Sequence, residues 1–157
     1  MKQIIGQIPE AETAEFNRIG YTIGGMMVFP ANQVDRKWTI NQARGCHPRI
    51  RDRFDLTLEC IRRHYLDEPS PLSGTLARYA AFFRLFGDFA GYVDFFLLHD
   101  LVDEVGLTVK FSVPFEDFTT SPLPRTLDAY LAYRQRAIEF IDLRNQRIAA
   151  QVGAGPL

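Results

Sequence analysis

The residues best suited to chemistry in this chain lie between Asn41 and Asp55, within the stretch TINQARGCHPRIRDRFD. Arginine side chains bind phosphate and carboxylate groups through paired, charge-assisted hydrogen bonds. A polar loop that leads into a helix adds free backbone N–H groups and the positive end of the helix dipole. Gly45 would let the backbone come close to a ligand. The segment therefore predicts an anion site, with the candidate ligand-binding residues Asn41, Gln42, Arg44, Gly45, Arg49 and Arg53.

A structural interpretation of the same segment stays open beside the anion site. Asn41 and Gln42 would then hold the loop, and the arginines would pair with Asp52, Asp55 and an acidic segment further along the chain. Residues 36–64 carry eight Lys or Arg against three acids, whereas residues 87–104 carry five acids and no Lys or Arg. Segments of this kind commonly pack with their charged faces towards each other or towards water.

A second group of ionisable residues follows on a predicted helix, where His99 and Asp103 are four residues apart. That spacing places both side chains on one helix face, as two metal ligands would require. Asp100 and Glu104 fall on a different face, so further ligands would have to come from elsewhere. We therefore expect no metal site, and His99 and Asp103 are the residues to check.

The chain has two cysteines, Cys46 and Cys60, whose spacing matches no zinc or redox motif. Cys46 could act as a nucleophile beside His47, because nearby arginines would lower its pKa. Adjacent residues rarely present both side chains to one reaction centre, however, and no acid is identifiable to orient the histidine. Cys60 lies in an apolar helical pattern and is expected in the core. The catalytic residues and cofactors, if any, are therefore unknown at this stage.

Aromatic residues are unusually frequent, and many fall in one block of the chain. Their helical spacing is typical of a packed core. The block could instead line a pocket for a planar ligand, or form part of a homodimer contact, since a small domain cannot easily hide this much apolar surface. Its members are Phe82, Phe83, Phe86, Phe89, Tyr92, Phe95 and Phe96.

The elements that would position these residues predict an α+β fold, a mostly helical single domain with a small antiparallel sheet or hairpin. Residues 23–29 and 109–113 are apolar and β-branched, which favours strands. Residues 38–40 could pair back as a further short strand. An apolar stripe that includes Ile50 and Leu58 predicts a helix over residues 47–66, with Pro48 in its first turn.

The second half of the chain is predicted to be largely helical. Gly87 and Gly91 would divide residues 75–104 into two helices. A long C-terminal helix is expected after the prolines near residue 122. Arg134 and Asn145 fall on its buried line, which suggests polar contacts or partial exposure there. The single domain would span residues 1–157, with an N-terminal arm at 1–18 and a frayed tail at 151–157.

Composition narrows the class of protein. The chain has 157 residues, of which 46% are hydrophobic, as expected for one globular domain. Its net charge of -1 does not support nucleic-acid binding through bulk charge. The sequence contains no signal-peptide pattern and no long uncharged apolar stretch, so we expect a cytoplasmic protein with reduced thiols and no membrane partner.

Several blocks of the chain resemble a known family. TINQARG, DRFDLTLECIRRHY and LFGDFAGYVDFFLLHDLV, followed by PFEDF, are similar to a bacterial family of uncharacterised proteins that carries a domain-of-unknown-function label. The resemblance runs from about Ile19 to Ile148 and implies a single cytosolic domain. Members of that family often carry a further N-terminal region, so it also implies a short or N-terminally truncated member. No activity comes with the resemblance.

Three functions remain open at this point. The first is binding of a small anionic ligand, phosphate-bearing or a nucleotide, at the Asn41–Asp55 junction. The second is a non-enzymatic module that binds a protein partner or forms a homodimer through its charged and aromatic surfaces. The third is an enzyme acting on nucleotides or nucleic acid, for which no acid–base or metal group is recognisable.

Overall fold

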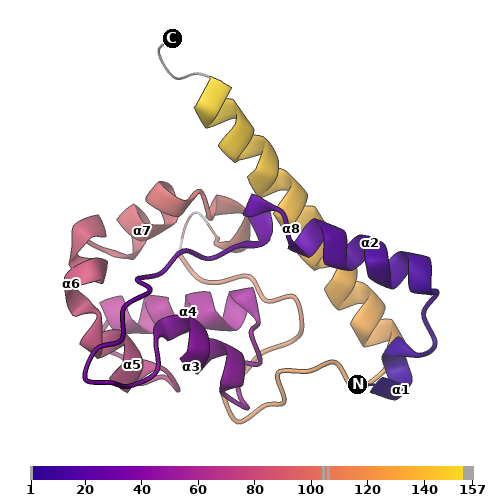
Figure 1. The fold of residues 1–157 in the computed structure, drawn as a ribbon, viewed down its shortest axis with the longest axis horizontal. Coiled ribbons are helices and arrows are strands. Elements are labelled where there is room, and N and C mark those ends of the chain that lie inside the picture. The colour runs from indigo at the N-terminus through magenta and orange to yellow at the C-terminus, as the bar shows by residue number, and fades with distance from the viewer. Residues whose placement is uncertain (1, 104, 106, 154–157) are drawn as a thin grey trace. The chain divides into compact units, whose positions relative to one another are not determined.

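The structure is a computed structural model that describes residues 2–103, 105 and 107–153. Its regular elements within those ranges are helices (Figure 1). The chain divides into two compact units. Unit 1 consists of Met1–Met26 and Leu123–Leu157, and unit 2 consists of Met27–Pro122.

Unit 1 is built on one long helix. The C-terminal helix α8 (Leu127–Gly153) packs against α2 (Glu10–Gly20) and against the short 3-10 turn η1 (Ile23–Gly25), and α1 (Lys2–Ile5) also contacts it (Figure 1). The predicted N-terminal arm and the long C-terminal helix therefore belong to the same compact unit. The end of the predicted tail, residues 154–157, lies outside the described residues.

The η1 turn is attached to α8 by two buried or half-buried polar side chains. The Arg144 guanidinium is buried and donates to the carbonyl oxygens of Gly24 at 2.9 Å and Met26 at 2.7 Å. Asn145 Oδ1 accepts from the Gly24 N–H at 2.8 Å. A Cβ atom on Gly24 would lie 2.4 Å from the carbonyl oxygen of Ile141, so only glycine fits this contact. The polar contact expected at Asn145 is thus present.

Unit 2 surrounds a central helix, α4 (Phe54–Tyr65). Every residue from Asp55 to Ile61 is buried, because α5 and α7 pack against α4 and the long loop over residues 107–122 is hydrogen-bonded to its first turn. The other elements of the unit are α3 (Ile40–Cys46), α5 (Ser73–Arg78), α6 (Ala80–Phe83), η2 (Arg84–Phe86), α7 (Phe89–Phe96) and η3 (His99–Leu101).

The predicted α+β fold is wrong. No β-strand forms anywhere in the described ranges, and the predicted second strand makes only a single antiparallel bridge, between Val102 and Val109. The predicted first strand is interrupted because Gly24 is held in a 3-10 turn by α8. Thr39, which was predicted in a returning strand, instead caps the N-terminus of α3. Apolar, β-branched segments favour strands only where another strand is available to pair with them.

The predicted helix over residues 47–66 is present but begins later than expected. Arg51 and Asp52 adopt left-handed backbone conformations, with φ of 51° and 62°, and α4 begins only at Phe54. Ile50 remains fully buried although it precedes the helix. The apolar stripe therefore identified core residues correctly while misplacing the helix start.

Candidate functional site

The segment NQARG, predicted as a loop, forms most of the short helix α3. Thr39 Oγ1 accepts from the Gln42 N–H at 3.3 Å, and Gln42 Oε1 accepts from the Thr39 N–H at 3.0 Å. This reciprocal pair is a capping box, and the pattern Thr-x-x-Gln in the sequence is its signature. Gln42 therefore caps the helix, while Asn41 is exposed and Gly45 has open space where a side chain would be.

Arg44 connects α3 to the start of α4. Its Nε donates to the Thr57 hydroxyl at 3.0 Å, and its guanidinium also donates to the Asp52 carbonyl oxygen at 3.0 Å. The Asp52 carboxylate lies 2.5 Å away. Burial lowers the pKa of Arg44, and the Asp52 charge opposes that shift. The side chain is thus engaged by protein groups on several sides.

Arg53 and Asp55 form an ion pair in the interior of unit 2, with side chains 4% and 3% exposed. Arg53 Nε donates to Asp55 Oδ1 at 3.0 Å, and its NH1 donates to the carbonyl oxygen of Pro122 at 2.8 Å. Asp55 also accepts from the backbone N–H of Leu56 and of Ser112, each at 2.8 Å. Because each charge meets several partners, its desolvation is offset. The pair holds the loop over residues 111–122 against the first turn of α4.

Arg49, one of the six predicted ligand-binding residues, lines a groove in unit 2. The groove has a volume of about 580 Å³ and includes Pro48 and Phe118 among its apolar lining. Its ionisable and hydroxyl-bearing residues come from the loop after α3, from α4 with the turn that follows it, and from the long loop: His47, Arg49, Arg63, Ser70, Asp117 and Thr119.

The charged side chains in this groove differ in how much they already interact with other protein groups. Arg63 donates to the buried Glu59 carboxylate at 2.7 Å, and its guanidinium carbon lies 5.0 Å from the centre of the Phe118 ring. Asp117 accepts from the N–H and hydroxyl of Thr119, and these bonds, together with the charge of Arg49, lower the pKa of its carboxyl. Arg49 is exposed, so its guanidinium is the cation most open to a ligand.

His47 adds a titratable group to the same groove. Its Nδ1 accepts from the backbone N–H of Arg49 at 3.2 Å, which leaves Nε2 as the nitrogen that carries the proton of the neutral ring. Partial burial lowers the pKa of His47, and the Arg49 charge lowers it further. The imidazole is therefore neutral near pH 7 and offers one N–H donor.

The residues flagged for metal binding do not share a helix face. His99 lies in η3 and its Nε2 is 2.7 Å from Asp94 Oδ1, whereas Asp103 Oδ1 accepts from the Val105 N–H in a turn. Glu104 lies outside the described residues. Within the part of the chain that the structure covers, no three His, Cys, Asp or Glu side chains are grouped as metal ligands would be.

The two cysteines occupy contrasting environments. Cys46 is exposed at the end of α3. Cys60 is buried in α4, and burial raises the pKa of its thiol to about 12. Since the thiolate is the reactive form, Cys60 is suited to packing and not to nucleophilic chemistry.

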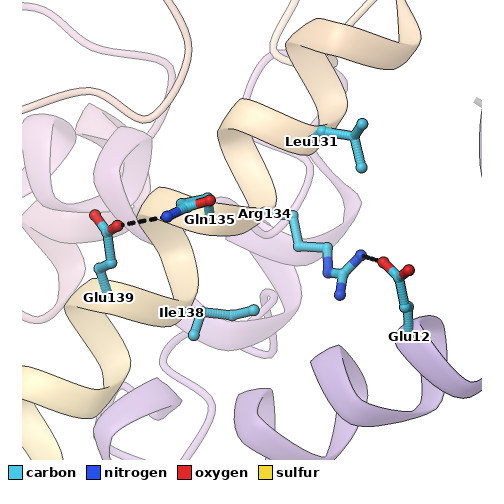
Figure 2. A pocket seen from close by; sticks show the side chains of 6 residues that line it. All are labelled: Glu12, Leu131, Arg134, Gln135, Ile138 and Glu139. Atoms are coloured by element: carbon cyan, nitrogen blue, oxygen red, sulfur yellow. Dashed lines mark hydrogen bonds and ion pairs between the residues drawn. The ribbon is translucent and has the colours of Figure 1, made fainter.

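A second groove, of about 490 Å³, lies in unit 1 between α2 and α8. Figure 2 shows its lining: Arg134 points to Glu12 with 2.5 Å between NH1 and Oε2, and Gln135 donates to Glu139 at 2.9 Å. Leu131 completes one side. Arg134 is neutralised by Glu12, and Glu139 adds a further negative charge. This groove is therefore less suited to an anion than the groove beside Arg49.

Sequence reasoning found Arg49 but missed most of the residues around it. The pattern around Arg49 does not place Arg63, Asp117 or Thr119 beside it. These residues lie far apart in the chain and meet because the long loop returns to α4. The Thr-x-x-Gln pattern at Thr39 was a local signal that Gln42 caps a helix and does not bind a ligand.

Comparison with known proteins places the chain in a family. No curated protein and no solved structure matches it. No helix in the described ranges is both long and apolar enough to cross a membrane. A model described as a family of unknown function (DUF6994) matches residues 1–148, including the segment before Ile19. This match confirms the predicted membership in an uncharacterised family, and the chain belongs to the family of unknown function DUF6994.

Proposed function

We propose that this protein binds a small phosphate- or carboxylate-bearing ligand in the groove beside Arg49. The observation that carries the proposal is a difference in hydrogen bonding among the arginines of the Asn41–Asp55 segment. Arg44 and Arg53 donate to protein groups, whereas the Arg49 guanidinium makes no hydrogen bond or ion pair with any described residue and lies on a groove. An exposed guanidinium next to a concave surface is well suited to bind a carboxylate or phosphate.

The surroundings of Arg49 indicate the size and charge of the ligand. A groove of about 580 Å³ falls in the range of small-molecule sites and could hold a mononucleotide. The neutral His47 ring offers a second donor, and Arg63 a partly neutralised charge. Asp117 opposes an anion, because its carboxylate already interacts with Arg49. The ligand must therefore compete with Asp117, which favours a dianionic phosphate over a single carboxylate.

Isothermal titration with pyrophosphate and with AMP at low ionic strength tests this proposal. Arg49→Ala is the test variant, and Arg51→Ala is the matched control, because Arg51 is exposed in the same loop and does not line the groove. A hydrogen bond to a charged group contributes about 1.5–3 kcal/mol, so Arg49→Ala should weaken binding by about tenfold or more. Arg51→Ala should change it by less than about threefold.

Two results would oppose the proposal. One is wild-type protein that binds neither ligand at millimolar concentration. The other is an equal loss of affinity in Arg49→Ala and Arg51→Ala, which would indicate general attraction to a basic loop and not a groove.

A further inference from the structure

A group of exposed and half-buried apolar side chains, mostly aromatic, lies on α6, η2 and α7 of unit 2. These elements belong to the segment drawn in pink in Figure 1. Leu85 is 76% exposed and Phe95 69% exposed. The ring centroid of Phe86 lies 5.2 Å from Phe82, 5.0 Å from Phe95 and 5.2 Å from Phe96. We define these five residues as the aromatic surface. Exposed apolar patches of this kind commonly mark interaction sites.

The aromatic surface is distinct from the core that the same elements contribute. Phe83, Phe89 and Tyr92 are buried, whereas Phe82, Phe86 and Phe96 are only half-buried. Burying a phenylalanine side chain stabilises a structure by about 1.5–3 kcal/mol. Covering these five partly exposed apolar side chains with a partner would therefore add a favourable free energy of burial that the isolated chain lacks.

The aromatic surface is also held in a fixed shape. Gly87 turns the chain with a φ of 77°, and Asp88 caps α7 by accepting from the Gly91 N–H at 2.8 Å. A Cβ atom on Gly91 would lie 2.1 Å from the carbonyl oxygen of Phe86, so η2 and α7 approach closely. A surface fixed in this way loses little conformational entropy when it binds.

The neighbouring charges identify the kind of partner. Asp88 and Asp94 are exposed on α7 and its cap, and Arg84 on η2 is also exposed. Asp94 Oδ1 lies 2.7 Å from His99 Nε2, which leaves its second carboxylate oxygen for a partner. Symmetric pairing of two copies would bring these net negative surfaces together, which opposes a homodimer. A segment with apolar anchors flanked by Lys or Arg would instead gain ion pairs with the aspartates and cation–π contacts with the exposed rings.

We infer that the aromatic surface docks a basic amphipathic segment of another protein. The apolar side chains of that segment cover Phe86, Phe95 and Phe96, and its basic residues face Asp88 and Asp94. Such a role is independent of the groove beside Arg49.

A fluorescently labelled amphipathic helical peptide, with Leu and Trp on one face and Lys on the other, tests this inference by fluorescence anisotropy. A matched peptide carries Glu in place of every Lys. The protein variants are Phe95→Ser in the aromatic surface and Leu143→Ser as control, because Leu143 is an exposed leucine on α8 in unit 1. Asp94→Asn tests the charge.

We expect the Lys peptide to bind at least about tenfold more tightly than the Glu peptide. Phe95→Ser should weaken it by about tenfold or more, since buried aromatic anchors dominate binding, and Leu143→Ser should not. Asp94→Asn should flatten the dependence of affinity on salt. Equal binding of both peptides, or equal binding by wild type and Phe95→Ser, would overturn the inference. So would a dimer in light scattering that Phe95→Ser dissociates, because the occupant would then be a second copy.

Discussion

The buried ion pair between Arg53 and Asp55 allows a quantitative test of how unit 2 is held together. Replacing Asp55 with Asn removes the charge that faces a guanidinium only 4% exposed. It also places an NH2 group where a carboxylate oxygen accepts from Arg53, Leu56 or Ser112. The remaining arginine charge would be buried beside donors that have lost an acceptor.

The cost of this change follows from its burial. Removing one partner of a buried ion pair costs about 3–5 kcal/mol, because the other charge stays desolvated. In a chain of this length that corresponds to a fall in Tm of roughly 6–20 °C. Asp52→Asn is the matched control: Asp52 also pairs with an arginine, Arg44, but is 68% exposed. Arg44 is only 11% exposed, but water screens the exposed Asp52 carboxylate, so we expect its removal to cost about 1 kcal/mol or less.

Urea unfolding followed by the fluorescence of Trp38 measures this difference, because Trp38 is the one tryptophan in the chain and lies in unit 2. We expect a large shift of the midpoint for Asp55→Asn and a small one for Asp52→Asn. The double variant Arg53→Met, Asp55→Leu should regain part of the loss, since no charge is then left unpaired, although the Leu56 and Ser112 N–H groups still lose the Asp55 acceptor. Equal effects of the two single variants, or a double variant as unstable as Asp55→Asn, would refute the reasoning.

Three further predictions concern other parts of the chain. Gly24→Ala should lower the free energy of unfolding by about 1–3 kcal/mol, because its Cβ would overlap backbone of α8. Gly45→Ala places its Cβ in open space, so it should be neutral or stabilise the fold by up to about 1 kcal/mol. Thermal melts that rank the two variants in the opposite order would contradict this. A thiol reagent should modify Cys46 quickly in the folded protein and Cys60 only after unfolding; rapid modification of both would show that α4 is open. Burial lowers the pKa of His64 from 6.5, and the charge of Asp67 opposes this shift to a smaller extent. Below pH 6.5 the unfolded state therefore binds a proton at His64 more readily than the folded state does. Stability should decline as the pH falls through 6.5 towards the folded-state pKa. His64→Gln should reduce that decline in urea titrations at about pH 7.5 and about pH 5.5, and an unchanged pH dependence would show that other groups cause it.

The sequence predicted helices where apolar periodicity was strong. Of the predicted apolar stripe, Ile50, Leu58 and Ile61 are fully buried, whereas Phe54 and Tyr65 are only half-buried. It did not predict where α4 begins, since nothing local shows that Arg51 and Asp52 adopt left-handed conformations. The sheet was wrong because strand-like composition cannot reveal whether a partner strand exists, and at Gly24 the partner is a helix that lies more than a hundred residues later.

The candidate site was also predictable only in part, because the contacts that decide it come from residues far away in the sequence. Arginine density marked the correct segment, but whether each guanidinium faces the protein or solvent depends on distant residues. Arg44 meets Thr57, and Arg53 meets Pro122. Arg49 lines a groove that is completed by Thr119, on a loop with no regular secondary structure. Periodicity carries no information on such a loop.

The most direct test of the central claim is a titration of isotope-labelled protein with pyrophosphate, followed by the chemical shifts of its backbone amides. The groove beside Arg49 predicts saturable shifts at His47, Arg49 and Thr119, with little change at Asn41 and Gln42. Saturable shifts confined to Asn41 and Gln42, or no saturable shift at any amide, would contradict an anion site in this groove.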